Sequence, residues 1–278
     1  MPEVTFRFHG SLNDFLTPER RGASFRRDVP SHSSLKDAIE ALGVPHPEIG
    51  RVVVDGRAAA LDERVVAGSS IDVYPFPGEV TAAEPGPRFV LDGHLGRLAR
   101  YLRILGVDAA YDAKAADVDL AERAVTEGRV LLTRDVGLLK RGRVSRGYWL
   151  RAEQPEEQLA EVVRRFGLLA VARPFGRCLR CNAELETVDR EEVVDRLPPR
   201  TRREFAEFRR CPACSRIYWK GSHYDRMRRL LARLVEQLEE PSEGRSEGQL
   251  ESRGEGQLES RGEGKLEGRI RDPLDAPG

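Results

Sequence analysis

The chain has 278 residues, with 46 Lys and Arg, 46 Asp and Glu, and a formal net charge of zero at pH 7. The chain is long enough for more than one domain, since one domain takes roughly 150 residues. No stretch reaches the roughly 18 to 20 continuous apolar residues of a membrane span, and the start MPEVTFRFHG lacks the apolar segment of a signal peptide. We therefore expect a cytoplasmic protein with no membrane partner.

The zero net charge conceals a segregation along the chain. Residues 1–87 carry 9 basic and 13 acidic side chains, residues 88–235 carry 31 and 21, and residues 236–278 carry 6 and 12. A basic middle segment suits a polyanionic partner, because its surface attracts phosphates. The alternative is that the additional arginines are solvated and bind nothing.

The first 80 residues form the first predicted domain. VTFRF, RVVVDG and SIDVYPF have the composition of strands, and SLKDAIEALGV has that of an amphipathic helix, capped by Ser33 or Ser34 and ending near Gly43. The order β, β, α, β, β resembles the β-grasp, ubiquitin-like fold of the ThiS and MoaD sulfur carriers.

Those carriers end in a free Gly-Gly tail, whereas here the last strand continues through PFPGEVTAAEPGPRF. We therefore expect this domain to bind or position a protein partner and not to carry sulfur; a purely structural appendage is the alternative. Residues 81–87, TAAEPGP, are the predicted linker.

Residues 88–172 contain two apolar runs that each end on an aspartate. FVLD closes at Asp92 and RVLLTRD closes at Asp135. Strand and helix patterns alternate around them, which predicts a parallel sheet with right-handed crossovers. Ligands bind beyond the carboxyl ends of such strands, so the sequence predicts one shared site that contains both carboxylates.

A third carboxylate in this region is Asp117, where the helix of VDLAERAVTEG begins. Asp112 and Asp119 lie nearby. Mg²⁺ and Mn²⁺ prefer oxygen ligands from several acids, and such ions activate water and neutralise charge in phosphodiester hydrolysis. The alternative role of Asp117 is to cap its own helix.

HLGRLARYLRILG, directly after Asp92, is predicted to be a helix that ends at Gly106. One face carries a buried stripe formed by Leu95, Leu98, Ala99, Leu102 and Leu105. Arg97, Arg100 and Arg103 share another flank, and the first two are the better candidates for contacts to phosphates beside the acidic site. Solvated arginine is the ordinary alternative.

Residues 173–235 contain the motifs CLRC and CPAC. Cys178, Cys181, Cys211 and Cys214 are therefore predicted to hold a structural Zn²⁺ in a closed site that has no catalytic position. The 29 intervening residues exceed the 15 to 20 of a plain ribbon. We expect residues 191–208 to form a partly helical insertion.

RIYWKGSHYDRMRR follows the second cysteine pair and mixes aromatic with basic side chains. Trp219 and His223 are the candidates for binding single-stranded nucleic acid there, since aromatic rings stack on unpaired bases while cations hold phosphates. Packing of the small ribbon is the alternative for Trp219. A second role for His223 is proton donation near the scissile phosphate.

Residues 236–278 repeat with a period of eight, as in SEGQLESR, GEGQLESR and GEGKLEGR. One leucine per repeat buries too little apolar surface to offset the entropy of ordering. The sequence predicts a disordered, acidic tail.

Taken together, FVLDGHLGRLARYLRILGVDAAYD, EGRVLLTRD, PEEQL, the two cysteine pairs and YWKGSHYDRM resemble the Mut-seven C-terminal RNase domain family, a branch of the PIN-like nucleases, over about residues 88–230. The resemblance implies a three-layer α/β/α fold with a zinc ribbon and a metal-dependent site that cleaves RNA. By motif, Asp92, Asp117 and Asp135 become its acids. Such proteins often carry an aspartate as a fourth acid; here either Glu153 takes its place or the site has three acids.

The leading hypothesis is an endoribonuclease in which Mg²⁺ or Mn²⁺ activates water at this carboxylate cluster. One alternative is a nucleic-acid-binding adaptor whose acidic site is vestigial. Another is a nuclease that acts on DNA, since preference for RNA follows only from the family resemblance.

Overall fold

We describe the protein from a computed structural model, which covers residues 3–30, 32–76 and 86–239. The chain divides into two compact units. One contains Met1–Gly78, Phe89–His94 and Tyr111–Arg151, and the other contains Glu79–Arg88, Leu95–Ala110 and Ala152–Gly278, each as far as its residues are described. Most of the predicted linker (81–85) and the predicted tail from residue 240 lie outside the described residues.

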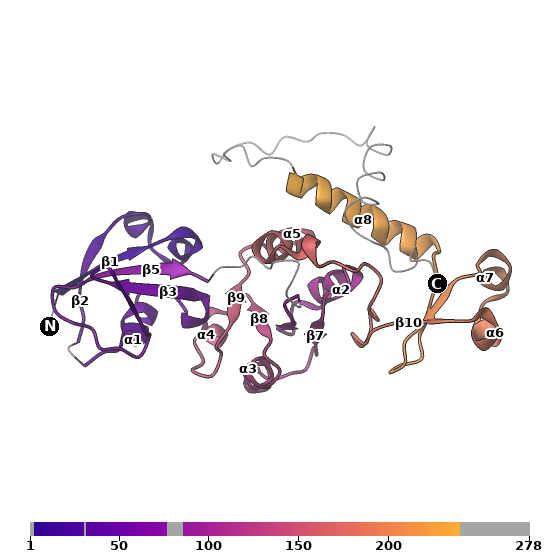
Figure 1. Cartoon of the computed structure of the whole chain (residues 1–278), viewed down its shortest axis with the longest axis horizontal. Helices are drawn as coiled ribbons and strands as arrows, with labels where there is room; N and C mark the ends of the chain where they lie inside the picture. Colours follow the sequence, from indigo (N-terminus) through magenta and orange to yellow (C-terminus); the bar gives the residue numbers. More distant parts are fainter. Residues whose placement is uncertain (1–2, 31, 77–85, 240–278) are drawn as a thin grey trace. The chain divides into compact units, whose positions relative to one another are not determined.

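The N-terminal segment is a five-stranded sheet in the order β2-β1-β5-β3-β4. Its strands are β1 (Glu3–Phe8), β2 (Phe25–Asp28), β3 (Ile49–Val54), β4 (Arg57–Ala59) and β5 (Ser70–Pro75). The pairing of β1 with β5 is parallel and the other pairings are antiparallel. This topology, with the one α-helix α1 (Leu35–Glu40) among the described residues of the segment, confirms the predicted β-grasp fold (Figure 1).

Helix α1 begins as the sequence predicts. Ser34 Oγ accepts a hydrogen bond from the Asp37 N–H, and the Asp37 carboxylate accepts one from the Ser34 N–H, which forms a capping box. Three short 3-10 helices complete this segment: η1 (Gly10–Phe15), η2 (Pro18–Arg20) and η3 (His46–Glu48). Fifteen buried side chains, among them Phe6, Phe8 and Ile71, form the core of this domain.

The second sheet has the order β7-β6-β8-β9. It consists of β6 (Phe89–Leu91), β7 (Ala109–Tyr111), β8 (Val130–Thr133) and β9 (Gly147–Trp149). Every residue of β6 and β8 is buried, which explains why these strands are continuous apolar runs and not alternating ones. Because β8 is parallel to both neighbours, the predicted α/β domain with a parallel sheet is confirmed.

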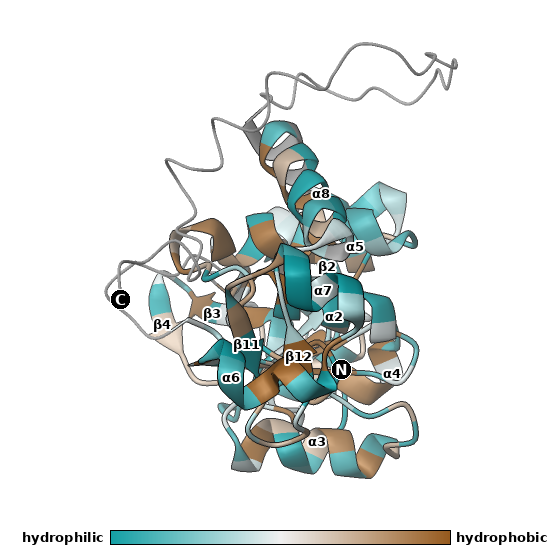
Figure 2. Ribbon diagram, turned by 90° about the vertical axis from the view of Figure 1, so that its right-hand side faces the viewer, coloured by the Kyte–Doolittle hydropathy of each residue, from teal (hydrophilic) through white to brown (hydrophobic). Residues whose placement is uncertain are grey.

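Helices alternate with these strands: α2 (Gly96–Ile104), α3 (Asp117–Thr126), α4 (Val136–Leu139) and α5 (Pro155–Phe166), followed by η4 (Leu168–Ala170). The predicted stripe of α2 is buried throughout. Gly106 ends that helix with φ +79°, and a side chain there would collide with the Arg173 carbonyl. Helix α5 begins with Pro155 and ends at the left-handed Gly167. Figure 2 shows hydrophilic and hydrophobic residues alternating along α3.

The cysteine-containing segment has a three-stranded antiparallel sheet of order β10-β11-β12, formed by Glu186–Val188, Phe208–Arg210 and Ile217–Tyr218. Between the cysteine pairs lie α6 (Arg190–Val193), η5 (Val194–Arg196) and α7 (Pro199–Glu204), so the predicted helical insertion is confirmed. The chain then enters α8 (Ser222–Glu239), which the sequence analysis left unassigned. No helix in the described ranges is long and apolar enough to cross a membrane.

Candidate functional site

The carboxyl edge of the second sheet brings two of the predicted acids together. Leu91 of β6 pairs with Leu132 of β8, so Asp92 and Thr133 follow side by side. The Asp92 N–H donates to the Leu132 carbonyl at 3.1 Å, which fixes the backbone of this half-buried residue. The Asp92 side chain is therefore held at the strand end where the sequence analysis expects it.

Thr133 is the link between Asp92 and Asp135, and the sequence analysis missed it. Its side chain is fully buried, and its hydroxyl donates to Asp92 Oδ2 at 2.8 Å. The Thr133 hydroxyl oxygen in turn accepts the Asp135 N–H at 2.9 Å. One hydroxyl thus orients the carboxylate of one acid and the backbone of the other. A Thr two residues before Asp135, at the end of an apolar strand, is the signal that could have found it.

Asp135 is exposed and forms the N-cap of the short helix α4. Its Oδ1 accepts the Gly137 N–H at 2.7 Å. Nearby, the Trp149 indole donates to the Arg134 carbonyl at 3.2 Å, which ties β9 to the same loop. Arg134 itself is exposed. The loop after β8 is therefore held from both sides of Asp135.

Asp117 is the first residue of α3 and is not its cap. The N-cap is Ala116, which makes no side-chain bond, so the alternative capping role of Asp117 is wrong. Instead, Asp117 Oδ2 accepts from the Arg141 guanidinium at 3.0 Å. Both side chains are close to half exposed, so this ion pair is accessible and weak.

The remaining predicted residues are dispersed. Arg97 and Arg100 are exposed on α2, whereas Arg103, on the same predicted flank, is 4% exposed and is not available to phosphates. Glu153 is exposed ahead of α5.

The acids match hard divalent cations in chemistry, but they do not form a ready ligand group. Across the described ranges, the four cysteines are the only group of three or more potential ligands close enough to share an ion. Asp92 and Asp135 are oxygen donors of the kind that Mg²⁺ and Mn²⁺ prefer. The Asp117 carboxylate is bonded to Arg141. The donor set therefore suits such an ion, and the carboxylates would have to move to bind it together.

The four cysteines form a compact cluster. The sulfurs of Cys178 and Cys214 are 3.5 Å apart, those of Cys181 and Cys211 are 3.3 Å apart, and all four lie within 4.8 Å of one another. Tetrahedral zinc, with Zn–S bonds of about 2.3 Å, needs sulfurs about 3.8 Å apart. The cluster therefore fits a closed Zn²⁺ site.

Each cysteine pair sits in the same kind of tight turn. Asn182 donates its N–H to the Cys178 carbonyl at 2.9 Å, and Ser215 donates to the Cys211 carbonyl at 2.8 Å. Both residues after the pairs have positive φ, +70° and +58°. The two halves of the site are thus built alike, although they are far apart in the sequence.

Tyr218 supports this cluster from β12. Its hydroxyl lies 3.2 Å from the Cys178 sulfur and accepts the Leu179 N–H at 3.1 Å. Burial opposes ionisation of Cys178, but the Tyr218 hydroxyl and the backbone amides of Cys181 and Arg180 lower its pKa to about 6. Cys178 is therefore the cysteine whose thiolate the protein itself stabilises.

Arg103 supports the cluster from α2. Its guanidinium donates to the carbonyls of Ala109 at 2.9 Å and of Leu179 and Arg180 at 3.0 Å each. The two latter residues lie between the first two cysteines. Arg103 is thus a structural clamp on the first cysteine turn.

The aromatic residues after the second cysteine pair pack in two different places. Trp219 is half-buried and packs against the ribbon core, as the packing alternative expects. Tyr224 on α8 contacts the Phe175 ring, with centroids 4.3 Å apart. The side chain of His223 lies outside the described part of the structure, so its predicted roles stay predictions.

Comparisons with known proteins agree with this architecture. A family model described as the Mut7-C RNAse domain matches residues 87–231, and one described as Mut7-C ubiquitin matches residues 1–80. No curated protein matches the chain.

Two solved structures match part of the chain. The crystal structure of H. volcanii small archaeal modifier protein 1 is 23% identical, with an alignment over 27% of this chain and 98% of that chain and a TM-score of 0.23. The crystal structure of SAMP1 from Haloferax volcanii is 24% identical over 26% and 93% of the two chains, with a TM-score of 0.22. The Mut7-C RNAse domain match covers more than half of the sequence, and the chain therefore belongs to the Mut7-C RNAse domain family, with a Mut7-C ubiquitin domain at its N-terminus.

Proposed function

We propose that this protein is a PIN-like endoribonuclease that depends on Mg²⁺ or Mn²⁺ and cuts RNA at the carboxyl edge of the β7-β6-β8-β9 sheet. The observation that carries the proposal is the buried Thr133 hydroxyl, which is bonded both to the Asp92 carboxylate and to the Asp135 backbone. A buried side chain that orients two exposed or half-exposed acids is what a preorganised metal site needs. The family description supports the nuclease class.

In this proposal, Asp92 and Asp135 bind the divalent ion and Asp117 completes the site after leaving Arg141. The bound ion would neutralise charge on the phosphate and activate water. Arg141, once released, carries a positive charge beside the acids and is suited to hold a phosphate of the substrate. Glu153 is the proposed fourth acid, and Arg97 and Arg100 are proposed phosphate contacts. RNA is chosen over DNA because the family is described as an RNase.

Zinc in the cysteine cluster is proposed as a structural ion, because four thiolates leave it no open position. Thiolates persist as metal ligands in a reducing compartment, which supports a cytoplasmic location. A protein partner for the β-grasp domain stays a prediction, supported by the matching ubiquitin description alone.

The test is a cleavage assay on the full chain. Labelled single-stranded RNA and DNA of the same sequence are incubated with Mg²⁺, with Mn²⁺ and with a chelator. We expect cutting of RNA that the chelator abolishes. Asp135→Asn should reduce the rate by about a hundredfold, because a carboxylate ligand is lost while asparagine still caps α4.

Asp119→Asn is the matched control, since Asp119 is an exposed acid in the first turn of α3 with no proposed role. If wild type and Asp135→Asn bind RNA equally and neither cuts it under any metal condition, the adaptor alternative replaces the enzyme. Faster cutting of DNA than of RNA would instead favour the DNA-directed nuclease.

A further inference from the structure

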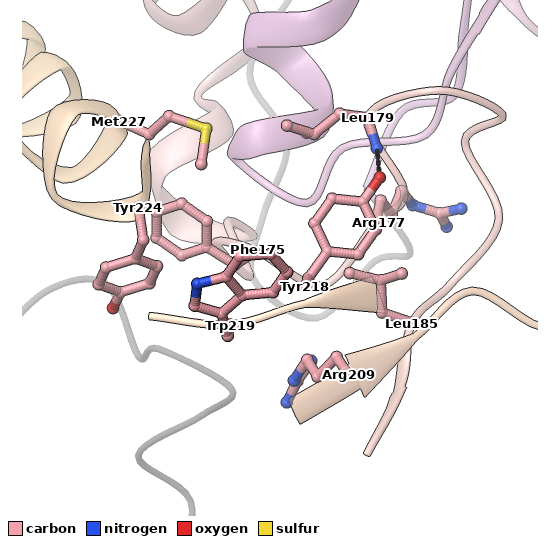
Figure 3. A pocket seen from close by; sticks show the side chains of 9 residues that line it. All are labelled: Phe175, Arg177, Leu179, Leu185, Arg209, Tyr218, Trp219, Tyr224 and Met227. Atoms are coloured by element: carbon pink, nitrogen blue, oxygen red, sulfur yellow. Dashed lines mark hydrogen bonds between the residues drawn. The ribbon is translucent and has the colours of Figure 1, made fainter. Parts of the chain in front are cut away.

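The second unit contains an aromatic hollow beside the cysteine cluster (Figure 3). Its walls come from three separate segments: Phe175 precedes the first cysteine pair, Trp219 follows β12, and Tyr224 and Met227 lie one turn apart on α8. The hollow measures about 380 Å³, counting the space open to solvent. All four side chains are half-buried, so the aromatic surface is reachable from outside.

The walls of this hollow are held in place. Tyr218, at its back, is fixed by its bonds to Cys178 and Leu179. The Trp219 indole edge lies over Gly221, where even a Cβ would come within 2.7 Å of Nε1. The Phe175 and Tyr224 rings pack on each other, with centroids 4.3 Å apart and planes inclined by 39°. An aromatic wall that is preformed in this way presents its outer surface to a flat ligand at little entropic cost.

The charges around the hollow favour an anionic ligand chain. Residues 173–235 carry 16 Lys and Arg against 9 Asp and Glu. Arg177 lines the wall but is bonded to the Gly106 and Asn182 carbonyls and to Glu184, so its role is structural. Arg173, Arg180 and Arg226 are exposed next to lining residues in the sequence.

We propose that this hollow binds an unpaired base of single-stranded RNA, which stacks against the aromatic wall formed by Trp219, Tyr224 and Phe175 while neighbouring arginines contact its phosphates. Base stacking on aromatic side chains next to cations is how single-stranded nucleic acid is held without sequence preference. The choice of RNA rests on the proposed function. The hollow then anchors the substrate strand at the zinc module, separately from the chemical step at the sheet edge.

Tryptophan fluorescence tests the proposal directly, because the chain has only two Trp residues. Full-length protein with Asp135→Asn, which slows cutting, and Trp149→Phe reports from Trp219 alone. Titration with short single-stranded RNA should quench this signal, since a stacked base contacts the indole. The same strand without bases, in which only ribose and phosphate remain, should bind more weakly and leave the fluorescence unchanged.

Tyr224→Ala in the same background should raise the Kd for RNA at least about fivefold, and Tyr224→Phe should leave it unchanged, because the ring and not the hydroxyl stacks. Unchanged zinc content and thermal unfolding establish that both variants fold. Equal affinity for the strand with and without bases, or an unchanged Trp219 signal at saturating RNA, would overturn the proposal. Quenching by a peptide of the chain's own acidic repeats, but not by RNA, would overturn it as well.

These results are independent of catalysis. If RNA quenches the Trp219 fluorescence but the wild type cuts no RNA, base binding in the hollow is supported and the proposed nuclease is refuted. Cleavage of RNA by the wild type, with no quenching of the Trp219 signal by RNA, would support the proposed nuclease and refute base stacking in the hollow.

Discussion

The two candidate metal sites of this protein differ in how far the surrounding chain prepares them. At the cysteine cluster, four sulfurs already lie within 4.8 Å of one another, and Tyr218 and Arg103 hold the turns that carry them. At the sheet edge, each acid is bonded to a protein donor: Asp92 to Thr133, Asp135 to Gly137 and Asp117 to Arg141.

This difference follows from the ions that the two sites suit. A structural zinc ion needs a closed tetrahedron that never opens. A catalytic divalent ion keeps water and substrate among its ligands, so its acids need orientation but not closure. We therefore expect changes at the cysteine cluster to lower the stability of the fold. Changes to the acids at the sheet edge should lower the cleavage rate.

The largest effect that separates the sites is removal of zinc. Structural zinc contributes about 10 kcal/mol or more to small zinc modules at neutral pH. Chelation, or Cys211→Ser at one of the two fully buried cysteines, should unfold residues 173–235, seen as lost hydrogen-exchange protection there. Removal of Mg²⁺ and Mn²⁺ alone is the control and should leave protection unchanged. If hydrogen-exchange protection of residues 173–235 persists without zinc, the two metal sites do not differ in the way that we propose.

Arg103→Met should have the next largest effect. It removes the donor of the buried Ala109 carbonyl and of the part-buried Leu179 and Arg180 carbonyls, which costs about 3 kcal/mol of unfolding free energy. Denaturant titration measures the loss. Arg100→Met on the exposed face of the same helix is the matched control and should stay within about 0.5 kcal/mol of wild type. Equal effects of the two changes would refute the role of Arg103 as a clamp.

Thr133→Val tests whether one hydroxyl organises the sheet edge. The Asp135 N–H loses its acceptor, which should cost about 1 to 3 kcal/mol of unfolding free energy. Asp92 also loses the donor that orients it, so the cleavage rate should fall at least about tenfold. Thr133→Ser keeps the hydroxyl and should restore most of the rate. A Ser variant as slow as the Val variant would show that the methyl group, and not the hydroxyl, matters.

Tyr218→Phe should have the smallest effect. It removes one hydrogen bond to the Cys178 sulfur, and such supporting contacts are worth about tenfold in metal affinity. Competition with a zinc chelator measures the change, and the fold should be retained because the ring stays in place. Unchanged zinc affinity would assign Tyr218 to packing alone.

The sequence predicted the local parts of this molecule well because local physics determines them. The apolar runs of β6 and β8, the stripe of α2 and the CxxC spacing each depend on neighbouring residues, and the structure and the family matches confirm the fold class they imply. The helix α8 was missed, since its basic and aromatic start hides the apolar positions that follow.

Long-range partners could not be read in the same way. Arg103 shares its helical spacing with Arg97 and Arg100, and nothing in that spacing reveals that it reaches the carbonyls of Leu179 and Arg180. Thr133 and Arg141 acquire their roles only when strand register and a loop bring them to Asp92 and Asp117.

The central claim is that the acids at the sheet edge cut RNA with a divalent ion, independently of zinc. Single-turnover cleavage of labelled RNA by Asp92→Asn in Mn²⁺, with zinc content measured on the same sample, tests it most directly. We expect a rate at least about a hundredfold below wild type with full zinc occupancy and unchanged thermal unfolding, because an amide is a poor ligand but still accepts from Thr133. A variant that cuts RNA at the wild-type rate would contradict the claim.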